Sequence, residues 1–132
     1  MPVVDASVLI AYLTDGEFAM EARAAIFAGR GDIWAPHLVD AEVGHALRRL
    51  ARVGELTAAN AGAALDDLGG LPILRVGHVG LARRAWDLRS NLSVYDALYV
   101  ALAEQLGVEL LTLDVRLAGS PGIRATAVTL PA

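Results

Sequence analysis

The chain contains no cysteine and no lysine, and these two absences exclude several kinds of chemistry. Without cysteine it can form no disulfide, no thiolate nucleophile and no cysteine-bound zinc site. Without lysine it has no Schiff-base or Walker-type lysine, so arginine, which supplies all 11 basic residues, is the only strong phosphate-binding side chain. A biased genome composition is the simpler explanation of this usage, because alanine is also abundant.

Long apolar runs are also missing. No run reaches 18 apolar residues, and the first residues lack the basic and apolar regions of a signal peptide. We therefore expect a soluble, cytoplasmic protein with no membrane segment. A chain of 132 residues with 55% hydrophobic content should fold as a single domain over residues 1–132.

The formal net charge of −4 provides no basic surface of the kind that nucleic-acid-binding proteins usually carry. If four acidic residues belong to a metal site, however, the remaining surface is close to neutral. The charge balance therefore permits a nuclease without indicating one.

Strand and helix signals alternate along the chain, which predicts an α/β fold. The expected architecture is a three-layer α/β/α sandwich with a mainly parallel central sheet. We expect strands at residues 2–4, 33–35, 71–76, 109–113 and 126–130, and helices at residues 6–13, 17–27, 36–53, 57–68, 79–89, 93–106 and 115–118.

Four carboxylates, Asp5, Glu42, Asp96 and Asp114, follow expected strands or lie at the start or edge of expected helices. In a parallel sheet such positions gather at the carboxyl ends of the strands, where ligands bind. Mg²⁺ prefers oxygen ligands and combines a few carboxylates with water and substrate phosphate. The sequence therefore predicts a divalent cation site and a phosphate-bearing substrate.

Each of these carboxylates also has an ordinary structural explanation. Asp5 and Asp114 could cap the helices that follow them, and the spacing of Ser93 and Asp96 fits a capping box. Capping and metal binding can coexist, because a carboxylate has two oxygens. Glu42, at the edge of an apolar helical stripe, needs a partner such as an arginine.

Neighbouring polar residues are weaker candidates. The hydroxyls of Ser7 and Thr112 could hold a ligand or a water, although local hydrogen bonding is their commoner role. Asp40, on the opposite edge of the same stripe, is a weaker ligand candidate than Glu42. Asp66 and Asp67 fit a solvated helix face, and the histidines and the Tyr95–Tyr99 pair fit surface or packing positions.

Four segments resemble, in order, the acidic motifs of the PIN-domain ribonucleases, in particular the VapC-type toxins of bacterial toxin–antitoxin pairs. The resemblance covers essentially the whole chain. By this resemblance, Asp5, Glu42, Asp96 and Asp114 are the catalytic, metal-binding residues and Thr112 is a supporting hydroxyl. The segments are residues 3–9 (VVDASVL), 35–47 (APHLVDAEVGHAL), 92–103 (LSVYDALYVALA) and 110–118 (LLTLDVRLA).

The resemblance implies a PIN-like fold and an endoribonuclease that hydrolyses RNA with Mg²⁺, for which Mn²⁺ can substitute. It also implies a cognate VapB-type antitoxin, a homodimer and larger toxin–antitoxin assemblies. Arg83, Arg84, Arg89 and Arg116 lie near the third and fourth motifs and are candidates for contacts to the RNA backbone. A solvated helix face explains these arginines equally well.

Other functions remain as alternatives. A phosphoacceptor receiver domain normally has adjacent acids after its first strand and a late lysine, whereas here Asp5 stands alone and lysine is absent. A non-catalytic PIN-like module that binds RNA or protein would keep the fold but lose the acids. A PIN nuclease that acts on DNA, or outside a toxin system, is the nearest alternative, and the sequence does not separate it from a toxin.

Overall fold

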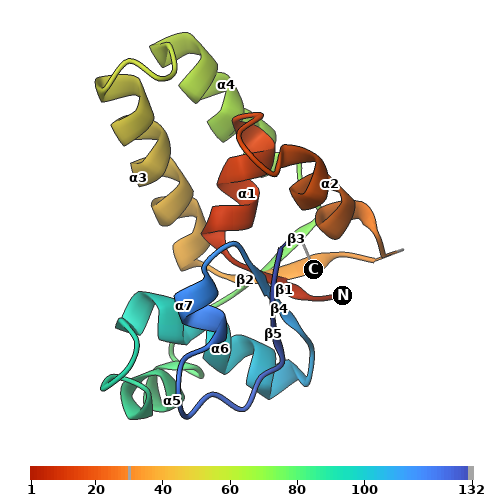
Figure 1. The fold of residues 1–132 in the computed structure, drawn as a ribbon, viewed down its shortest axis with the longest axis vertical. Helices are drawn as coiled ribbons and strands as arrows, with labels where there is room; N and C mark the ends of the chain where they lie inside the picture. The colour runs from red at the N-terminus through yellow and green to blue at the C-terminus, as the bar shows by residue number, and fades with distance from the viewer. Residues whose placement is uncertain (30, 131–132) are drawn as a thin grey trace.

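A five-stranded sheet crosses the middle of the molecule (Figure 1). The computed structural model describes residues 1–29 and 31–130. The strands are β1 (Val3–Val4), β2 (Ile33–Pro36), β3 (Ile73–Val76), β4 (Leu110–Thr112) and β5 (Ala127–Thr129). Their order is β3-β2-β1-β4-β5, and every neighbouring pair is parallel, which confirms the expected parallel sheet.

Helices cover both faces of this sheet, as a sandwich requires (Figure 1). The helices are α1 (Ala6–Leu13), α2 (Ala19–Phe27), α3 (Leu38–Arg52), α4 (Ala58–Gly69), α5 (Ala82–Asp87), α6 (Val94–Leu106) and α7 (Val115–Ala118). The first four lie on one side of the sheet, where α3 and α4 form a long antiparallel pair, and α5 and α6 lie on the other. The predicted α/β/α architecture is confirmed.

The topology determines where a ligand can bind. From β1 the chain adds β2 and β3 toward one edge of the sheet, and β4 and β5 extend it toward the other. The carboxyl ends of β1 and β4 therefore lie side by side at the point where the strand order reverses, which is the usual binding crevice of an open α/β sheet. Val3, Val4 and Leu110 are fully buried beside this point, so the crevice has a rigid base.

Helix α6 is the main helix on the second face, and its ends are those expected from the sequence. The Ser93 side chain accepts a hydrogen bond from the N–H of Asp96, and Gly107 ends the helix in the left-handed region at φ 66°. All seven residues from Ala97 to Ala103 are buried, because α6 lies between the sheet and α5.

Several element boundaries differ from the sequence-based expectation, most of them by one or two residues. Pro36 pairs with Val76 as the last residue of β2 and does not start α3. Helix α2 begins two residues later than expected, after Phe18 adopts a left-handed backbone at φ 66°. Helix α5 is shorter than residues 79–89, because a turn at His78–Leu81 precedes it.

No helix within the described ranges combines the length and apolar composition needed to cross a membrane.

Glu104 on α6 joins three segments of the second face. Its Oε1 accepts a hydrogen bond from Arg84 Nε on α5 at 2.7 Å, and its Oε2 accepts one from the backbone N–H of Arg124 at 2.7 Å. Arg84 also donates to the carbonyl of Gly122 at 2.8 Å. Burial alone would raise the pKa of the Glu104 carboxyl, but the hydrogen bonds from Arg84 and Arg124 hold that pKa below its ordinary value.

We predict that Glu104→Gln lowers the free energy of unfolding by about 1–2 kcal/mol at pH 7, because it weakens charge-assisted hydrogen bonds. A carboxyl whose pKa is lower in the folded state stabilises the protein at pH values above its pKa in the unfolded state. That contribution disappears as the pH falls through its pKa in the folded state. Urea unfolding of wild type and variant should therefore converge below the ordinary glutamate pKa of 4.5. The exposed neighbour Gln105→Ala is the control. A difference between wild type and Glu104→Gln that does not change with pH would contradict the assignment.

Candidate active site

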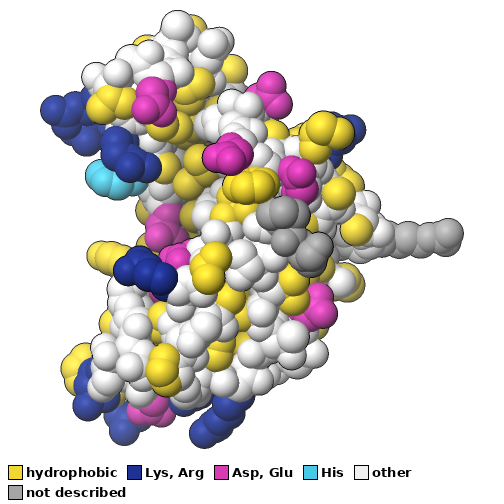
Figure 2. Space-filling view, in the orientation of Figure 1, with side chains coloured by type: hydrophobic (Ala, Val, Ile, Leu, Met, Phe, Trp, Pro, Cys, Tyr) yellow, Lys and Arg dark blue, Asp and Glu magenta, His cyan; other side chains and the backbone are white. Residues whose placement is uncertain are grey.

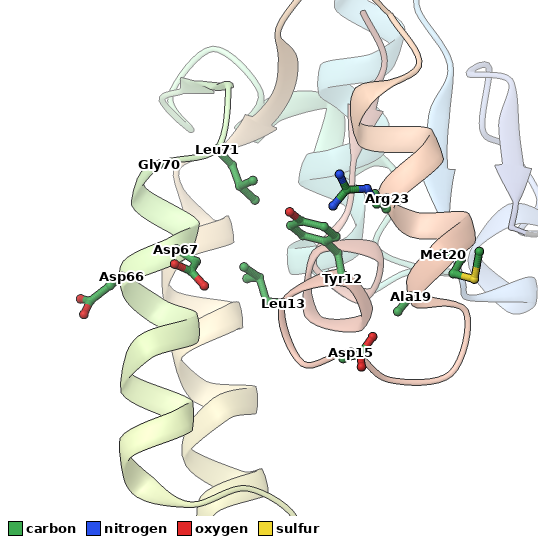
Figure 3. A pocket seen from close by; sticks show the side chains of 10 residues that line it. All are labelled: Tyr12, Leu13, Asp15, Ala19, Met20, Arg23, Asp66, Asp67, Gly70 and Leu71. Atoms are coloured by element: carbon green, nitrogen blue, oxygen red, sulfur yellow. The ribbon is translucent and has the colours of Figure 1, made fainter.

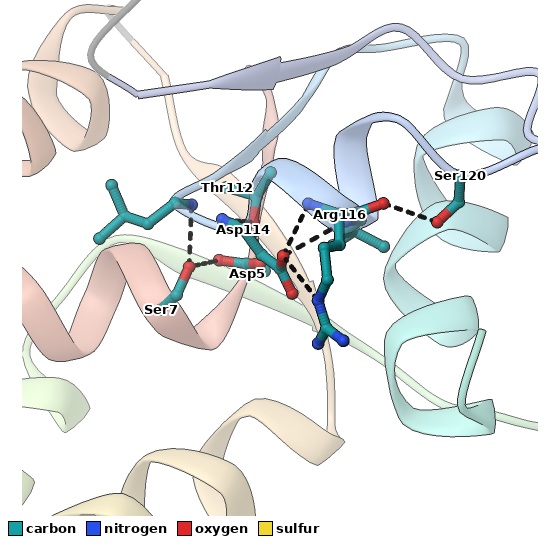
Figure 4. A network of polar contacts seen from close by, with 8 residues as sticks. Asp5, Ser7, Thr112, Asp114, Arg116 and Ser120 are labelled. Atoms are coloured by element: carbon teal, nitrogen blue, oxygen red, sulfur yellow. Dashed lines mark hydrogen bonds and ion pairs between the residues drawn. The ribbon is translucent and has the colours of Figure 1, made fainter. Parts of the chain in front are cut away.

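Asp5 is placed at the crevice because β1 runs directly into α1. As the N-cap of α1 its carboxylate accepts a hydrogen bond from the N–H of Val8, and it also accepts hydrogen bonds from the hydroxyls of Ser7 and Thr112 (Figure 4). The residue is only 7% exposed. Capping and membership of the acidic site coexist at Asp5, and both hydroxyls singled out in the sequence hold it.

Burial raises the pKa of the Asp5 carboxyl, and the hydrogen bonds from Ser7, Thr112 and Val8 offset this only in part. The charge of Asp96 raises the pKa further. The fold thus holds a carboxylate where the ionised form is poorly compensated, a pattern typical of functional sites.

Asp114 lies across the crevice from Asp5, because β1 and β4 pair in parallel with Val4 beside Leu111. Its Oδ1 accepts hydrogen bonds from the backbone N–H groups of Arg116 and Leu117 at 2.9 and 3.3 Å, so it caps α7. Its own N–H donates to Thr112 Oγ1 at 2.9 Å. Thr112 therefore connects the two aspartates, since its hydroxyl donates to Asp5 and accepts from Asp114 (Figure 4).

Asp96 enters the site from the first turn of α6. Its N–H is bonded to Ser93 Oγ at 3.1 Å, so the expected capping arrangement is present. Burial raises the pKa of the Asp96 carboxyl and the nearby charge of Asp114 raises it again, while Ser93 and Arg116 lower it. Asp96 and Asp114 therefore lie close enough for their charges to repel.

Glu42 lies on α3 and finds its partner in Tyr99 on α6. The Tyr99 hydroxyl donates to Glu42 Oε1 at 2.7 Å, so the expectation of an arginine partner was wrong. Burial raises the pKa of Glu42, and the charges of Asp96 and Asp5 add to the rise. Burial also raises the pKa of Tyr99, as does its bond to Glu42, so the phenol stays protonated as a donor.

Asp40, the weaker ligand candidate, does not join this group. Its carboxylate forms two hydrogen bonds with Arg75, at 2.7 and 2.8 Å, that tie α3 to β3.

The four predicted carboxylates line one cavity of about 790 Å³ between α1, α3, α6 and α7. Figure 2 shows acidic side chains in a hollow on this side of the molecule, with arginine and histidine side chains at its border. The side chains that line the cavity are those of Asp5, Ala6, Ser7, Ile10, Leu38, Ala41, Glu42, His45, Ala46, Arg49, Tyr95, Asp96, Tyr99 and Asp114.

The donor set of the cavity fits a hard divalent cation. Its four carboxylates offer oxygen ligands, and three of them have raised pKa values that a bound positive charge would lower, while His45 is the one residue of the lining with a nitrogen donor that metals bind. Within residues 1–29 and 31–130, no three acidic or histidine side chains converge closely enough to hold an ion with protein atoms alone. This spacing is compatible with Mg²⁺, which keeps several waters and takes few protein carboxylates.

Sequence reasoning missed three contributors to the cavity wall, His45, Arg49 and Tyr95, and the role of Tyr99. A helical spacing of three and seven residues from Glu42 places His45 and Arg49 on the face of α3 that Glu42 occupies, so this signal was present in the sequence. Tyr99 was expected to pack, and it does so with 1% exposure, but its hydroxyl also holds Glu42.

The four arginines proposed for RNA contacts lie in different surroundings. Arg116 is beside the site, with its Nε 3.9 Å from Asp114 Oδ1 and its side chain 93% exposed. Arg84 forms an ion pair with Glu104. The guanidinium carbon of Arg89 lies over the ring of Trp86, 4.5 Å from the ring centroid. Arg83 is exposed on α5, and none of the four lines the acidic cavity. Their role in RNA binding stays a prediction.

A second cavity, of about 630 Å³, lies between α1, α2 and α4 (Figure 3). Asp67 points toward Leu13 and Tyr12 at this cavity, whereas Asp66 points away from it. The acidic residues here do not gather as they do at the carboxyl ends of β1 and β4.

Known proteins are similar to this chain over most of its length. Residues 3–120 match the PIN domain family. Ribonuclease VapC9 of Mycobacterium tuberculosis is 45% identical over 132 residues, which cover 99% of each protein. Ribonuclease VapC1 of the same species is 54% identical over 90 residues, covering 67% of this chain and 68% of that protein.

Solved structures show the same fold. A toxin–antitoxin complex from Klebsiella pneumoniae contains a chain that superposes with a TM-score of 0.72, covering 98% of this chain and 97% of that one at 21% sequence identity.

We predict that Asp96→Asn stabilises the protein in the presence of a chelator. A carboxyl with a raised folded-state pKa favours folding while it is protonated, and stability falls as pH rises from 3.8 through the raised value. At pH 7 the neutral amide removes that cost, so the Tm should rise by roughly 2–6 °C. Thermal unfolding from pH 3 to pH 8 measures the effect, with the exposed Asp66→Asn as the control.

The gain in Tm for Asp96→Asn should disappear below pH 3.8, where the wild-type carboxyl is protonated as well. A lower Tm for Asp96→Asn at pH 7 would show that Asp96 is a net stabilising residue and would contradict the electrostatic description of the cavity.

Proposed function

The chain belongs to the PIN domain family, and from this premise we propose that it is a metal-dependent endoribonuclease, the toxin of a toxin–antitoxin pair. The observation that carries the proposal is the gathering of Asp5, Glu42, Asp96 and Asp114, from four separate segments, around one cavity. The relatives named as ribonucleases support the activity.

The four carboxylates would hold Mg²⁺ or Mn²⁺. Such an ion would supply Lewis-acid chemistry, by lowering the pKa of a water and by stabilising negative charge on phosphate oxygens.

The protein's own contribution is to orient the carboxylates. Ser7 and Thr112 fix both oxygens of Asp5, and the Tyr99 hydroxyl on α6 fixes Glu42 on α3. Asp114 is held by the first turn of α7. Because these residues are held by the helix ends and the sheet, little reorganisation accompanies binding of the charged substrate.

We also propose that a VapB-type antitoxin inhibits the protein, that the chain forms a homodimer, and that it acts in the cytoplasm. Support for the antitoxin comes from the toxin–antitoxin complex of Klebsiella pneumoniae, because one of its chains shares the fold of this chain. A PIN nuclease outside a toxin system would share the site but would have no inhibitory partner.

Purified protein should cleave RNA only when Mg²⁺ or Mn²⁺ is present, and a chelator should abolish cleavage. Asp5→Asn and Asp96→Asn should each bring cleavage below detection while circular dichroism stays that of the folded protein, because both changes preserve side-chain size. Asp66→Asn, which alters an acid remote from the cavity, is the matched control and should keep wild-type activity.

Cleavage by the wild type that resists chelation would contradict the metal requirement. Cleavage by both site variants at the wild-type rate would contradict the site. Absence of cleavage by the wild type on a broad set of RNAs would favour a non-catalytic binding module.

A further inference from the structure

Tyr95 is an aromatic side chain that lines the acidic cavity, and among the residues that the structure describes it forms no side-chain hydrogen bond and no aromatic or cation–π pair. It lines the cavity and yet is 62% exposed. It precedes Asp96 directly, and the exposed Val115, at 71%, follows Asp114 directly. Of these two exposed side chains, Tyr95 lines the cavity and Val115 does not. An exposed aromatic ring beside a polar cavity is the arrangement by which proteins stack a flat ligand.

Arg49 lines the same cavity from α3, whereas Tyr95 belongs to α6. It shares one face of α3 with Glu42, His45 and Ala46, and it lies two helical turns beyond Glu42, roughly 10 Å along the helix axis. Within residues 1–29 and 31–130, Arg49 forms no ion pair within 4 Å. An exposed guanidinium at the edge of a strongly acidic cavity can bind an anion that the carboxylates themselves would repel.

We propose that Tyr95 and Arg49 form a nucleotide subsite next to the carboxylates. Tyr95 stacks on a base and Arg49 binds a backbone phosphate, so the RNA lies across the cavity between α6 and α3. The inference rests on the proposed ribonuclease function and specifies its substrate class. A base must be unpaired and unstacked to lie on Tyr95, and the substrate is therefore single-stranded or looped RNA and not a continuous duplex.

Stacking and phosphate binding have different signatures, which allows each residue to be tested separately. Loss of a stacking ring weakens RNA binding without changing the number of counterions that the RNA releases when the protein binds. Loss of a phosphate-binding arginine reduces the dependence of binding on salt, by about 0.7 in the slope of log K against log salt for a single strand.

The test uses the cleavage-deficient Asp96→Asn protein in a chelator, with fluorescence anisotropy of a labelled mixed-sequence 12-nucleotide RNA as single strand and as duplex. Added Tyr95→Ala should weaken single-strand binding about 5- to 100-fold with an unchanged salt slope. Added Arg49→Ala should weaken binding and reduce the slope. Phe27→Ala, an exposed aromatic on α2, and Arg48→Ala, an exposed neighbour on α3, are the matched controls outside the cavity.

In the active protein, Tyr95→Ala should raise KM for single-stranded RNA by a larger factor than it lowers kcat. Unchanged binding after Tyr95→Ala, an equal loss on duplex RNA, or no binding by the parent protein would each overturn the subsite. Failure of the ribonuclease proposal is read separately, from the absence of metal-dependent cleavage by the wild type.

Discussion

The parallel pairing of β1 with β4 is the constraint on which the acidic site depends. It brings Asp5 and Asp114, which are more than 100 residues apart in sequence, to neighbouring strand ends, and it places Thr112 between them. The pairing is itself held by a buried core, since Val3, Val4 and Leu110 are fully buried. A shift of one residue in this register would turn Thr112 to the other face of the sheet and separate the two aspartates.

The fold holds these carboxylates at a cost to its own stability. Burial raises the pKa values of Asp5, Glu42 and Asp96, and each is raised further by a neighbouring carboxylate. Neutral donors satisfy individual oxygens, but they do not cancel the charge. Among the described residues, Arg116 is the one arginine within 4 Å of any of the four acids, and its side chain is 93% exposed. Such uncompensated charge is what a bound cation would neutralise.

Much of this arrangement could be predicted from the sequence, because it depends on local signals. The strand-to-helix position of Asp5, the Ser93 cap and the Gly107 stop are short-range patterns, and the four acids were identified from their placement in such patterns. The bond between Tyr99 and Glu42 was not predicted, because the two residues are 57 positions apart and meet only when α3 and α6 pack at the crevice. Pro36 was misplaced because proline suits the first turn of a helix, whereas here β2 ends with it beside Val76.

The most direct test of the central claim, that these carboxylates form one cation site, is calorimetric titration of Mn²⁺ into the wild type, Asp96→Asn and Asp66→Asn without RNA. We expect saturable binding to the wild type and to Asp66→Asn, and loss of that binding in Asp96→Asn. Equal affinity in all three proteins, or no saturable binding to the wild type, would contradict the claim and leave the carboxylates with capping and hydrogen-bonding roles alone.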